Sequence, residues 1–395
     1  MIVELLISGA SYYLLEALRN REFKAYKDEF DSVIDRIPAF KNNKNEQPHL
    51  ISYDSTDYGC KAKFILPISV TTDMLQSNYE ALKEAFELSS MNFEYDNRLI
   101  TLHGIKEYNF KTFKPLKLKP NELLVAEFLG KYIIVDMNKY PHALICGDTG
   151  TGKSRILFTI LTNLINNSNK ISLYLLQVRK NDLVVFRDCR QVKCCSRTLE
   201  EVLTALQEID QELQRRESLL DIEKGYLNIA DYNKLSGNNL KYIYVVIEEF
   251  SFLNISKADS KEEKFLKASA MKIIKSIVNV GRSSGVFLLT SLQKPTSDSI
   301  PTDIKAQLTA RIALTIKDKS TCQVVMGDDS AVNLEPRELV CRTNVLTKGY
   351  SLTIDFPEIK EFTQGSVIAK EQKPKPTAKE KVKDSANDLL KALGL

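Results

Sequence analysis

The sequence predicts an α/β fold in which a small α/β domain precedes a larger domain built on a mainly parallel sheet. Beyond residue 120, short apolar runs alternate with stretches of helical periodicity, which is the pattern of parallel strands joined by helices. Between residues 48 and 119, strand-like runs surround one helical stretch, which indicates a smaller separate unit. A chain of 395 residues also exceeds what one core usually organises, so more than one domain is expected.

The composition is that of an ordinary globular protein. Hydrophobic residues make up 43% and charged residues 27%, and the net charge of +4 is too small to demand a nucleic-acid partner by itself. A local basic surface is compatible with it. The chain has seven cysteines but only three histidines and no Cys-x-x-Cys pair. We therefore expect reduced thiols in a cytosolic protein rather than a metal site.

Residues 1–47 are expected to form an N-terminal helical segment. Residues 1–19 are apolar, but Glu4 and Glu16 interrupt them and leave a run well short of the ~20 residues that a membrane-spanning helix needs. The basic start of a signal peptide is missing as well. An amphipathic helix that packs on the protein or on a partner is the interpretation we favour, and weak membrane association is the alternative.

The small α/β domain and its linker are assigned to residues 48–119. We expect a helix with a threonine cap at Thr72–Leu88, and strands at Leu50–Tyr53, at Cys60–Val70 and, as a returning pair, within Phe93–Leu102. Nothing in this domain has catalytic spacing, so it is expected to bind or assemble. The basic stretch Lys106–Pro120 contains two prolines and is typical of a linker, with contact of its lysines to DNA as the alternative.

A phosphate-binding loop is predicted at residues 147–154, which read G-x-x-x-x-G-K-S. Glycines let successive backbone N–H groups turn toward an anion. The apolar run Ala143–Cys146 precedes the loop, and apolar residues from Ile156 onward recur at helical spacing, so the loop opens onto a helix N-terminus whose dipole favours phosphate. The alternative is a glycine-rich turn without a ligand. The expected nucleotide-binding residues are Gly147, Asp148, Thr149, Gly150, Thr151, Gly152, Lys153, Ser154 and Arg155.

Further strands of the larger sheet are expected at Ile171–Gln177, Tyr242–Ile247, Val286–Leu292 and Arg311–Ile316. Ligand-binding and catalytic residues of such sheets usually lie at the carboxyl ends of the strands. Charged helices are expected at Leu199–Leu220 and within Lys257–Lys275, and the simplest interpretation is that each has a solvated face. The alternative for Leu199–Leu220 is a subunit contact. The alternative for Lys257–Lys275 is a contact with DNA.

The strand at Tyr242–Ile247 runs into Glu248 and Glu249, which is the form of a Walker B element. Glu248 is expected to hold Mg²⁺, directly or through water, together with the hydroxyl of Ser154. Glu249 is expected to polarise the attacking water. The first acid is usually aspartate, so the longer Glu248 leaves the metal geometry and the rate of hydrolysis open. Two solvated carboxylates at a strand end are the alternative.

The ordered motifs resemble those of the FtsK/SpoIIIE family of DNA translocases. Pro141–Gly147, Gly281–Pro295 and Ala310–Ala313 look like the family's P-H-L-L-I-A-G, G-R-x-x-G-I-H-L-I-L-A-T-Q-R-P and T-R-I-A. Within the family, the architecture resembles the coupling proteins of Gram-positive conjugative elements and plasmids, and Met326–Asp329 looks like part of their M-F-G-S-D segment. The chain departs from the family pattern at Glu248, at Gln177–Lys180 in place of D-P-K, and at Lys294 in place of arginine.

The resemblance implies a RecA-like motor over residues 120–368 that binds ATP and Mg²⁺ and moves double-stranded DNA, usually as a homo-oligomeric hexameric ring. Lys153 would reach the β- and γ-phosphates, and Gln293 would sense the γ-phosphate. An arginine from a neighbouring subunit would stabilise transition-state charge. Arg311 is the first candidate for it and Arg282 the second, with a structural ion pair as the alternative for either. With Glu249, these four residues make up the expected catalytic set.

Residues 369–395 form a Lys/Pro/Ala/Glu-rich tail that is expected to be disordered and to end in a short helix. The tail or the N-terminal region would contact DNA-processing or secretion-channel proteins. The leading hypothesis is an ATP-driven translocase or coupling ATPase of a mobile element, acting in conjugative transfer or in plasmid or phage DNA processing. It would be cytoplasmic, or peripheral at the inner face of the membrane. The alternatives are a protein-secretion ATPase of the type VII kind and a nucleotide-gated assembly factor with little hydrolysis.

Overall fold

The computed structural model describes residue 21, residues 23–293 and residues 299–368. Its contacts divide the chain into two compact units, Met1–Asn109 and Phe110–Leu395, which are described separately below. The expectations for residues 1–19, for Lys294 and for the tail 369–395 lie outside the described residues. Within the described ranges, no helix is both long enough and apolar enough to cross a membrane.

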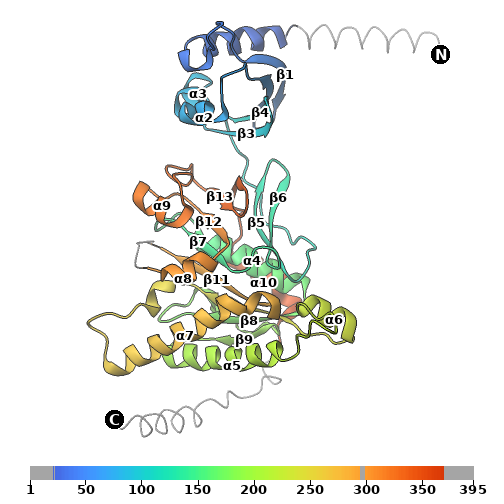
Figure 1. Ribbon diagram of the computed structural model, residues 1–395, viewed down its shortest axis with the longest axis vertical. Coiled ribbons are helices and arrows are strands. Elements are labelled where there is room, and N and C mark those ends of the chain that lie inside the picture. The colour runs from blue at the N-terminus through green and yellow to red at the C-terminus, as the bar shows by residue number, and fades with distance from the viewer. Residues whose placement is uncertain (1–20, 22, 294–298, 369–395) are drawn as a thin grey trace, which may run out of the picture. The chain divides into compact units, whose positions relative to one another are not determined.

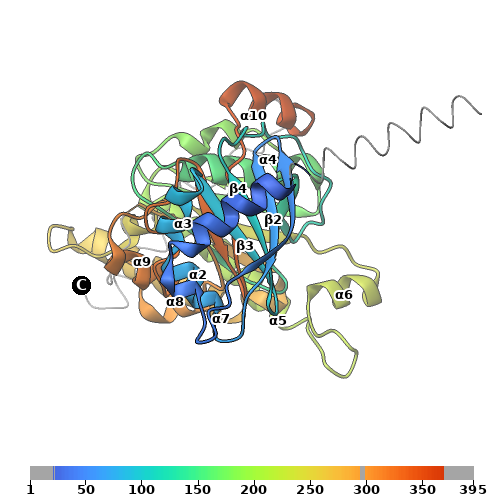
Figure 2. The ribbon, with the colours of Figure 1, turned by 90° about the horizontal axis from the view of Figure 1, so that it is seen from above.

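The first unit is a four-stranded antiparallel sheet covered by helices. Its strand order is β1-β2-β4-β3, with β1 at His49–Thr56, β2 at Gly59–Ile65, β3 at Ser90–Asp96 and β4 at Leu99–Ile105. A helix over residues 23–35 crosses these strands (Figure 2) and buries Phe30, Val33 and Ile34. The short 3₁₀ helix η1 at Pro38–Phe40 follows it. The strands that the sequence predicts are therefore confirmed, although their ends differ.

The single helix expected at Thr72–Leu88 is wrong, because the structure has α2 at Thr72–Ser77 and α3 at Tyr79–Ala85. Asn78 leaves the helical conformation between them, with φ −105° and ψ 19°. Its side-chain amide donates to Met74 O at 2.8 Å, and Ser77 Oγ donates to Asp73 O at 2.8 Å. Such side chains compete with the backbone for helix carbonyls. The N-cap residue is Thr71, but its side chain accepts no capping hydrogen bond.

The second unit contains a ten-stranded sheet of order β6-β5-β14-β13-β12-β7-β11-β10-β8-β9 (Figure 1). The strands from β12 to β9 in this order run parallel to their neighbours. They are β12 at Ala310–Ala313, β7 at Ala143–Cys146, β11 at Val286–Leu292, β10 at Tyr242–Ile247, β8 at Ile171–Leu176 and β9 at Val192–Cys195. Five of these strands were predicted, and their existence is confirmed.

The sheet continues as an antiparallel extension that the sequence analysis missed. It consists of β5 at Glu122–Phe128, β6 at Lys131–Asp136, β13 at Glu338–Arg342 and β14 at Leu346–Tyr350. Strand β5 has five consecutive buried residues, so it shows no alternation that would mark it as a strand. The predicted last strand at Tyr350–Ile354 is displaced, because β14 ends where that prediction begins.

Helices cover both faces of the parallel strands. On one face lie α4 at Lys153–Asn167 and α10 at Phe356–Thr363, which pack on each other (Figure 2). The other face packs against α5 at Leu199–Glu217 and α7 at Lys261–Ser284 (Figure 1), as well as against α8 at Thr302–Gln307 and α9 at Lys319–Met326. Burial on both faces explains why the central strands are continuous apolar runs. The remaining elements are α6 at Ile229–Ser236, η2 at Asp182–Phe186, η3 at Phe250–Leu253 and η4 at Gln364–Ser366.

The basic stretch Lys106–Pro120 is fixed to the second unit over much of its length. Phe113 is fully buried, and its N–H donates to Thr353 O at 2.7 Å. Further along, Leu116 N donates to Asn163 Oδ1 of α4 at 2.8 Å. Lys111 Nζ lies 3.2 Å from a carboxylate oxygen of Glu127 on β5. The second half of this stretch thus packs as part of the larger unit.

Candidate functional site

The predicted phosphate loop follows β7, the strand that lies between β11 and β12 in the sheet. Gly147 has φ 149°, and a Cβ there would lie 2.9 Å from Leu314 Cβ and from Thr151 Oγ1. Gly150 and Gly152 have φ 83° and 109°, a backbone region that side chains disfavour. Gly152 is the N-cap of α4 and offers no side-chain cap. The first N–H groups of α4 are therefore available to an anion.

The base of the loop is tied to the segment after β12. Asp148 N donates to Thr315 O at 3.0 Å, and Asp148 Oδ2 accepts from Lys317 N at 3.2 Å. Within the loop, Thr151 Oγ1 donates to Asp148 O at 2.8 Å. Thr149 is exposed at the tip of the loop. These bonds hold the loop in its turn.

The ammonium of Lys153 is held by the loop itself. Nζ donates to Gly147 O at 2.6 Å and to Asp148 O at 2.8 Å, and the residue is only 7% exposed. Burial lowers the pKa of Lys153, while the nearby Glu249 carboxylate acts in the opposite direction. A phosphate in the loop would replace neutral carbonyls with a charged acceptor, which binds an ammonium more strongly.

Glu248 is a buried acid with one unsatisfied oxygen. It follows β10 and is 4% exposed, and its Oε1 lies 3.6 Å from Lys180 Nζ. Burial raises the pKa of Glu248 to about 7; Lys180 opposes this shift and the Asp182 carboxyl adds to it. Oε2 is buried and has no hydrogen-bond partner among the described residues.

These features fit a bound cation. A buried carboxylate oxygen without a donor is satisfied by a cation or by the water that a cation holds. Ser154, the second residue of α4, supplies the hydroxyl that a P-loop presents to Mg²⁺. Oxygen donors of this kind suit Mg²⁺, which usually keeps several of its waters.

Glu249 is oriented by its neighbours and keeps one oxygen unused. Ser251 Oγ donates to its Oε1 at 2.8 Å, and Gln293 N lies 3.5 Å from the same oxygen. Oε2 is buried without a hydrogen-bond partner within the described ranges. Gln293 follows β11, the strand between β7 and β10, so it lies between the phosphate loop and the two acids. A base oriented on one oxygen with the other oxygen unused is suited to accept a proton from water.

The two candidate arginines lie outside this group. Arg311 is on β12, and its guanidinium donates to backbone carbonyls of Leu308 at 3.2 Å, Val325 at 2.8 Å and Lys305 at 3.3 Å. Burial lowers its pKa, and the charge of Arg342 adds to the shift. Arg282 is in the last turn of α7; it is exposed, and its Nε donates to Asn138 O at 3.1 Å. Their assignment as catalytic residues stays a prediction, because such an arginine would come from another chain.

The structure therefore brings together Lys153, Ser154, Glu248, Glu249 and Gln293 at the carboxyl edge of the parallel strands. Arg155 points elsewhere, since its Nη1 lies 3.5 Å from Ile354 O, close to α10. The sequence analysis missed Lys180 and Asp182, which follow β8. A usable signal was present, because polar residues after a buried parallel strand lie at the same edge as the acids.

His142 of the Pro-His motif has a structural position. It is fully buried, has φ 63°, and its Nδ1 accepts a hydrogen bond from Leu288 N at 3.0 Å. Burial lowers the pKa of His142 to about 4, so the ring is neutral at physiological pH. It fixes the start of β7 against β11 and thereby the place from which the loop begins.

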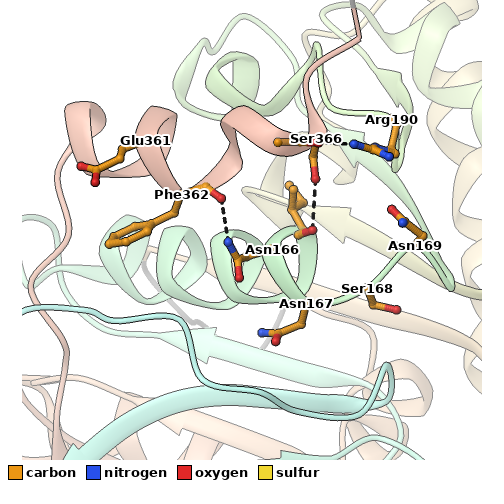
Figure 3. A pocket seen from close by; sticks show the side chains of 10 residues that line it. Asn166, Asn167, Ser168, Asn169, Arg190, Glu361, Phe362 and Ser366 are labelled. Atoms are coloured by element: carbon orange, nitrogen blue, oxygen red, sulfur yellow. Dashed lines mark hydrogen bonds between the residues drawn. The ribbon is translucent and has the colours of Figure 1, made fainter.

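A cavity of about 450 Å³ lies at the opposite end of α4 (Figure 3). Its polar walls are largely paired with backbone groups: Asn166 Nδ2 donates to Phe362 O at 2.8 Å, and Arg190 donates to Gly365 O. The 15 residues of α4 place it roughly 20 Å from the phosphate loop. It takes no part in the site described above.

The strand order, the loop after β7 and the acids after β10 define a RecA-like P-loop fold. The chain belongs to the FtsK/SpoIIIE family, whose sequence model matches residues 117–328. It is 24% identical over 266 residues to the DNA translocase FtsK of Oceanobacillus iheyensis, covering 62% of this chain and 32% of that protein. It is 28% identical over 247 residues to the DNA translocase FtsK of Helicobacter pylori, covering 60% of this chain and 28% of that protein. The chain thus spans about a third of the length of these curated relatives.

Two solved structures show the same fold. One is the pCW3 conjugation coupling protein TcpA in a monomer form with ATPγS, with a TM-score of 0.62 and 19% identity, covering 86% of this chain and 98% of that chain. The other is the cytoplasmic domain of the Thermomonospora curvata type VII secretion ATPase EccC, with a TM-score of 0.51 and 20% identity, covering 65% of this chain and 32% of that chain.

Proposed function

We propose that this chain is an ATPase that moves double-stranded DNA for a mobile element, in conjugative transfer or in plasmid or phage DNA processing. The observation that carries the ATPase part is the meeting of Lys153, Glu248 and Glu249 at one sheet edge, with unsatisfied carboxylate oxygens on both acids. Membership of the family supports DNA as the substrate. The likeness to a conjugation coupling protein over 98% of that protein's chain supports the mobile-element role.

Each residue of the site has a role in this proposal. The N–H groups of Lys153 and Ser154 at the start of α4, and the ammonium of Lys153, bind the phosphates. Ser154 and Glu248 hold Mg²⁺. Glu249 Oε2 orients a water and accepts its proton, and Gln293 detects whether the terminal phosphate is present. Bound ATP with Mg²⁺ supplies the phosphoanhydride bond whose hydrolysis releases the free energy for movement.

The proposal includes a homo-oligomer, with six subunits in a ring around the DNA. An arginine of one subunit would then complete the site of the next. Arg311 is committed to three carbonyls of its own chain, whereas Arg282 is exposed. We therefore place Arg282 ahead of Arg311 as the residue donated across the subunit boundary. The ring would work in the cytoplasm or at the inner face of the membrane, with a DNA-processing or secretion-channel protein as a partner.

A second candidate is a protein-secretion ATPase, because the fold of the type VII ATPase EccC matches 65% of this chain. The two candidates differ in what stimulates hydrolysis. A DNA motor contacts phosphates and is stimulated by duplex DNA in a salt-dependent way. A secretion ATPase responds to a protein substrate instead.

The test is steady-state ATP hydrolysis without nucleic acid, with single-stranded DNA and with double-stranded DNA, at two salt concentrations. We expect duplex DNA to raise turnover severalfold, the increase to fall at high salt, and Lys153→Ala to abolish turnover. If the rate of ATP hydrolysis does not change when DNA is added, the DNA-motor proposal is contradicted and a protein substrate is favoured. A chain that binds ATP and assembles without turnover would instead favour a nucleotide-gated assembly factor.

A further inference from the structure

Lys180 has no role in the function proposed above, yet its ammonium lies inside the site. It stands in the turn between β8 and η2 and is about one-third exposed, with Nζ 3.6 Å from Glu248 Oε1. Its charge also acts on Lys153, whose pKa it helps to lower. Lys180 therefore lies beside the acid after β10, and its charge acts on the lysine of the phosphate loop.

The turn that carries Lys180 is anchored. Gln177 N donates to Ser196 Oγ at 3.0 Å, and Ser196 Oγ donates to Gln177 O at 3.1 Å. Arg179 N donates to Arg197 O at 3.2 Å, and the side chain of Arg179 is exposed. Adjacent positions of the same turn thus send one cation into the site and the other toward solvent.

The contact between Lys180 and Glu248 is loose. At 3.6 Å it is longer than the ~2.7–2.9 Å of a charge-assisted N–H···O bond. The ammonium groups of Lys180 and Lys153 carry like charges that repel, and the repulsion is relieved when an anion binds near both of them. Lys153 is the lysine that a P-loop sends to the β- and γ-phosphates. A cation beside the metal-binding acid, at the same sheet edge as Lys153, is therefore within the part of the site where the terminal phosphate would lie.

We propose that Lys180 is a second cation for the γ-phosphate, which makes the site bind ATP in preference to ADP. The proposal rests on the ATPase function stated above. When ATP binds, the ammonium of Lys180 leaves Glu248 Oε1 for an oxygen of the γ-phosphate. Glu248 is thereby released to Mg²⁺ or its water at the moment when the metal arrives with the nucleotide. With ADP, Lys180 stays on Glu248.

The test compares Lys180→Met with Arg179→Met, which removes the same charge from the exposed neighbouring position. Affinities for ATP and ADP are measured by isothermal titration with Mg²⁺ present. We expect Lys180→Met to weaken ATP binding about tenfold while ADP binding changes by less than about twofold, because only ATP carries the γ-phosphate. Arg179→Met should keep both affinities. If Lys180→Met weakens ATP and ADP equally, or weakens neither, the proposal is overturned.

A second pair of variants separates phosphate binding from neutralisation of the buried acid. Lys180→Met leaves Glu248 without its cation and could unfold the chain. Lys180→Met/Glu248→Gln removes that charge, and its reference is Glu248→Gln alone. Thermal unfolding should show that Glu248→Gln and Lys180→Met/Glu248→Gln are similarly stable. Nucleotide titration without Mg²⁺ should show that Glu248→Gln still prefers ATP to ADP and that the double variant has lost this preference. A double variant that keeps the preference overturns the proposal. A wild-type chain that binds neither nucleotide overturns the ATPase function itself.

Discussion

The two ends of α4 differ in whether their polar side chains already have hydrogen-bond partners. The C-terminal end borders a cavity of about 450 Å³, but side chains such as Asn166 and Arg190 are already paired with backbone carbonyls there. At the N-terminal end, Glu248 and Glu249 each bury a carboxylate oxygen that lacks a partner among the described residues. Such oxygens are costly unless a ligand satisfies them. Buried carboxylate oxygens without a partner therefore mark the functional end of the helix better than the cavity does.

The largest expected effect comes from making the same substitution, Glu to Gln, at both ends of α4. Glu249→Gln removes the proposed base, and Glu361→Gln removes an exposed acid from the wall of the cavity. We expect Glu249→Gln to lower kcat for ATP by roughly 10²–10⁴-fold while ATP binding persists, since a positioned base contributes about that much. Glu361→Gln should leave kcat unchanged. The comparison is wrong if the two variants lose similar activity.

The next prediction concerns the pH dependence that Glu248 imposes on folding. Its pKa rises from an ordinary value of 4.5 to about 7 in the folded chain. The folded state therefore keeps a proton that the unfolded chain releases, so stability falls as the pH rises from about 4.5 to about 7. The loss is about 3 kcal/mol. Glu248→Gln should remove this loss, which chemical unfolding of both proteins at pH 5 and pH 8 would measure.

The same measurement is a check on the placement of the acid. The gain in stability of Glu248→Gln over the wild type should be larger at pH 8 than at pH 5. A gain that is equal at both values would mean that Glu248 has an ordinary pKa and is not buried. Saturating Mg²⁺ and ATP should reduce the difference at pH 8, because a bound cation stabilises the ionised acid.

Sequence reasoning found five of the six described parallel strands, all except β9, because the information that marks them is local. The apolar runs at β7, β10 and β11 lie next to polar residues with a chemical signature, so both strand and site can be predicted together. It missed β5 and β13, although each forms a hairpin with the next strand, because both are almost continuously buried and show no alternation. Lys180 was missed because its position after β8 places it near the acids only once β8 is known to lie beside β10. Its contact with Glu248 joins residues 68 positions apart and depends on the pairing of β8 with β10.

A smaller effect distinguishes the two candidate arginines. Arg311→Ala should destabilise the second unit by about 2 kcal/mol, because it leaves three backbone carbonyls without their donor. Arg282→Ala removes an exposed side chain and should cost less than about 1 kcal/mol. If Arg282 completes a neighbouring site, mixing Arg282→Ala with Glu249→Gln chains should restore part of the DNA-stimulated turnover. No recovery in the mixture would count against the transfer of Arg282 between subunits.

The smallest expected effect returns to the cavity end of α4. Asn166→Ala removes the hydrogen bond from Nδ2 to Phe362 O, which ties α4 to α10. Because Asn166 lies at the edge of the cavity (Figure 3), water can replace the lost donor, and the loss should be about 0.5–1 kcal/mol. Chemical unfolding measures that loss, and ATP turnover with duplex DNA should equal that of the wild type. A change in turnover with intact stability would show that the two ends of α4 are coupled, since the substitution touches nothing at the phosphate loop.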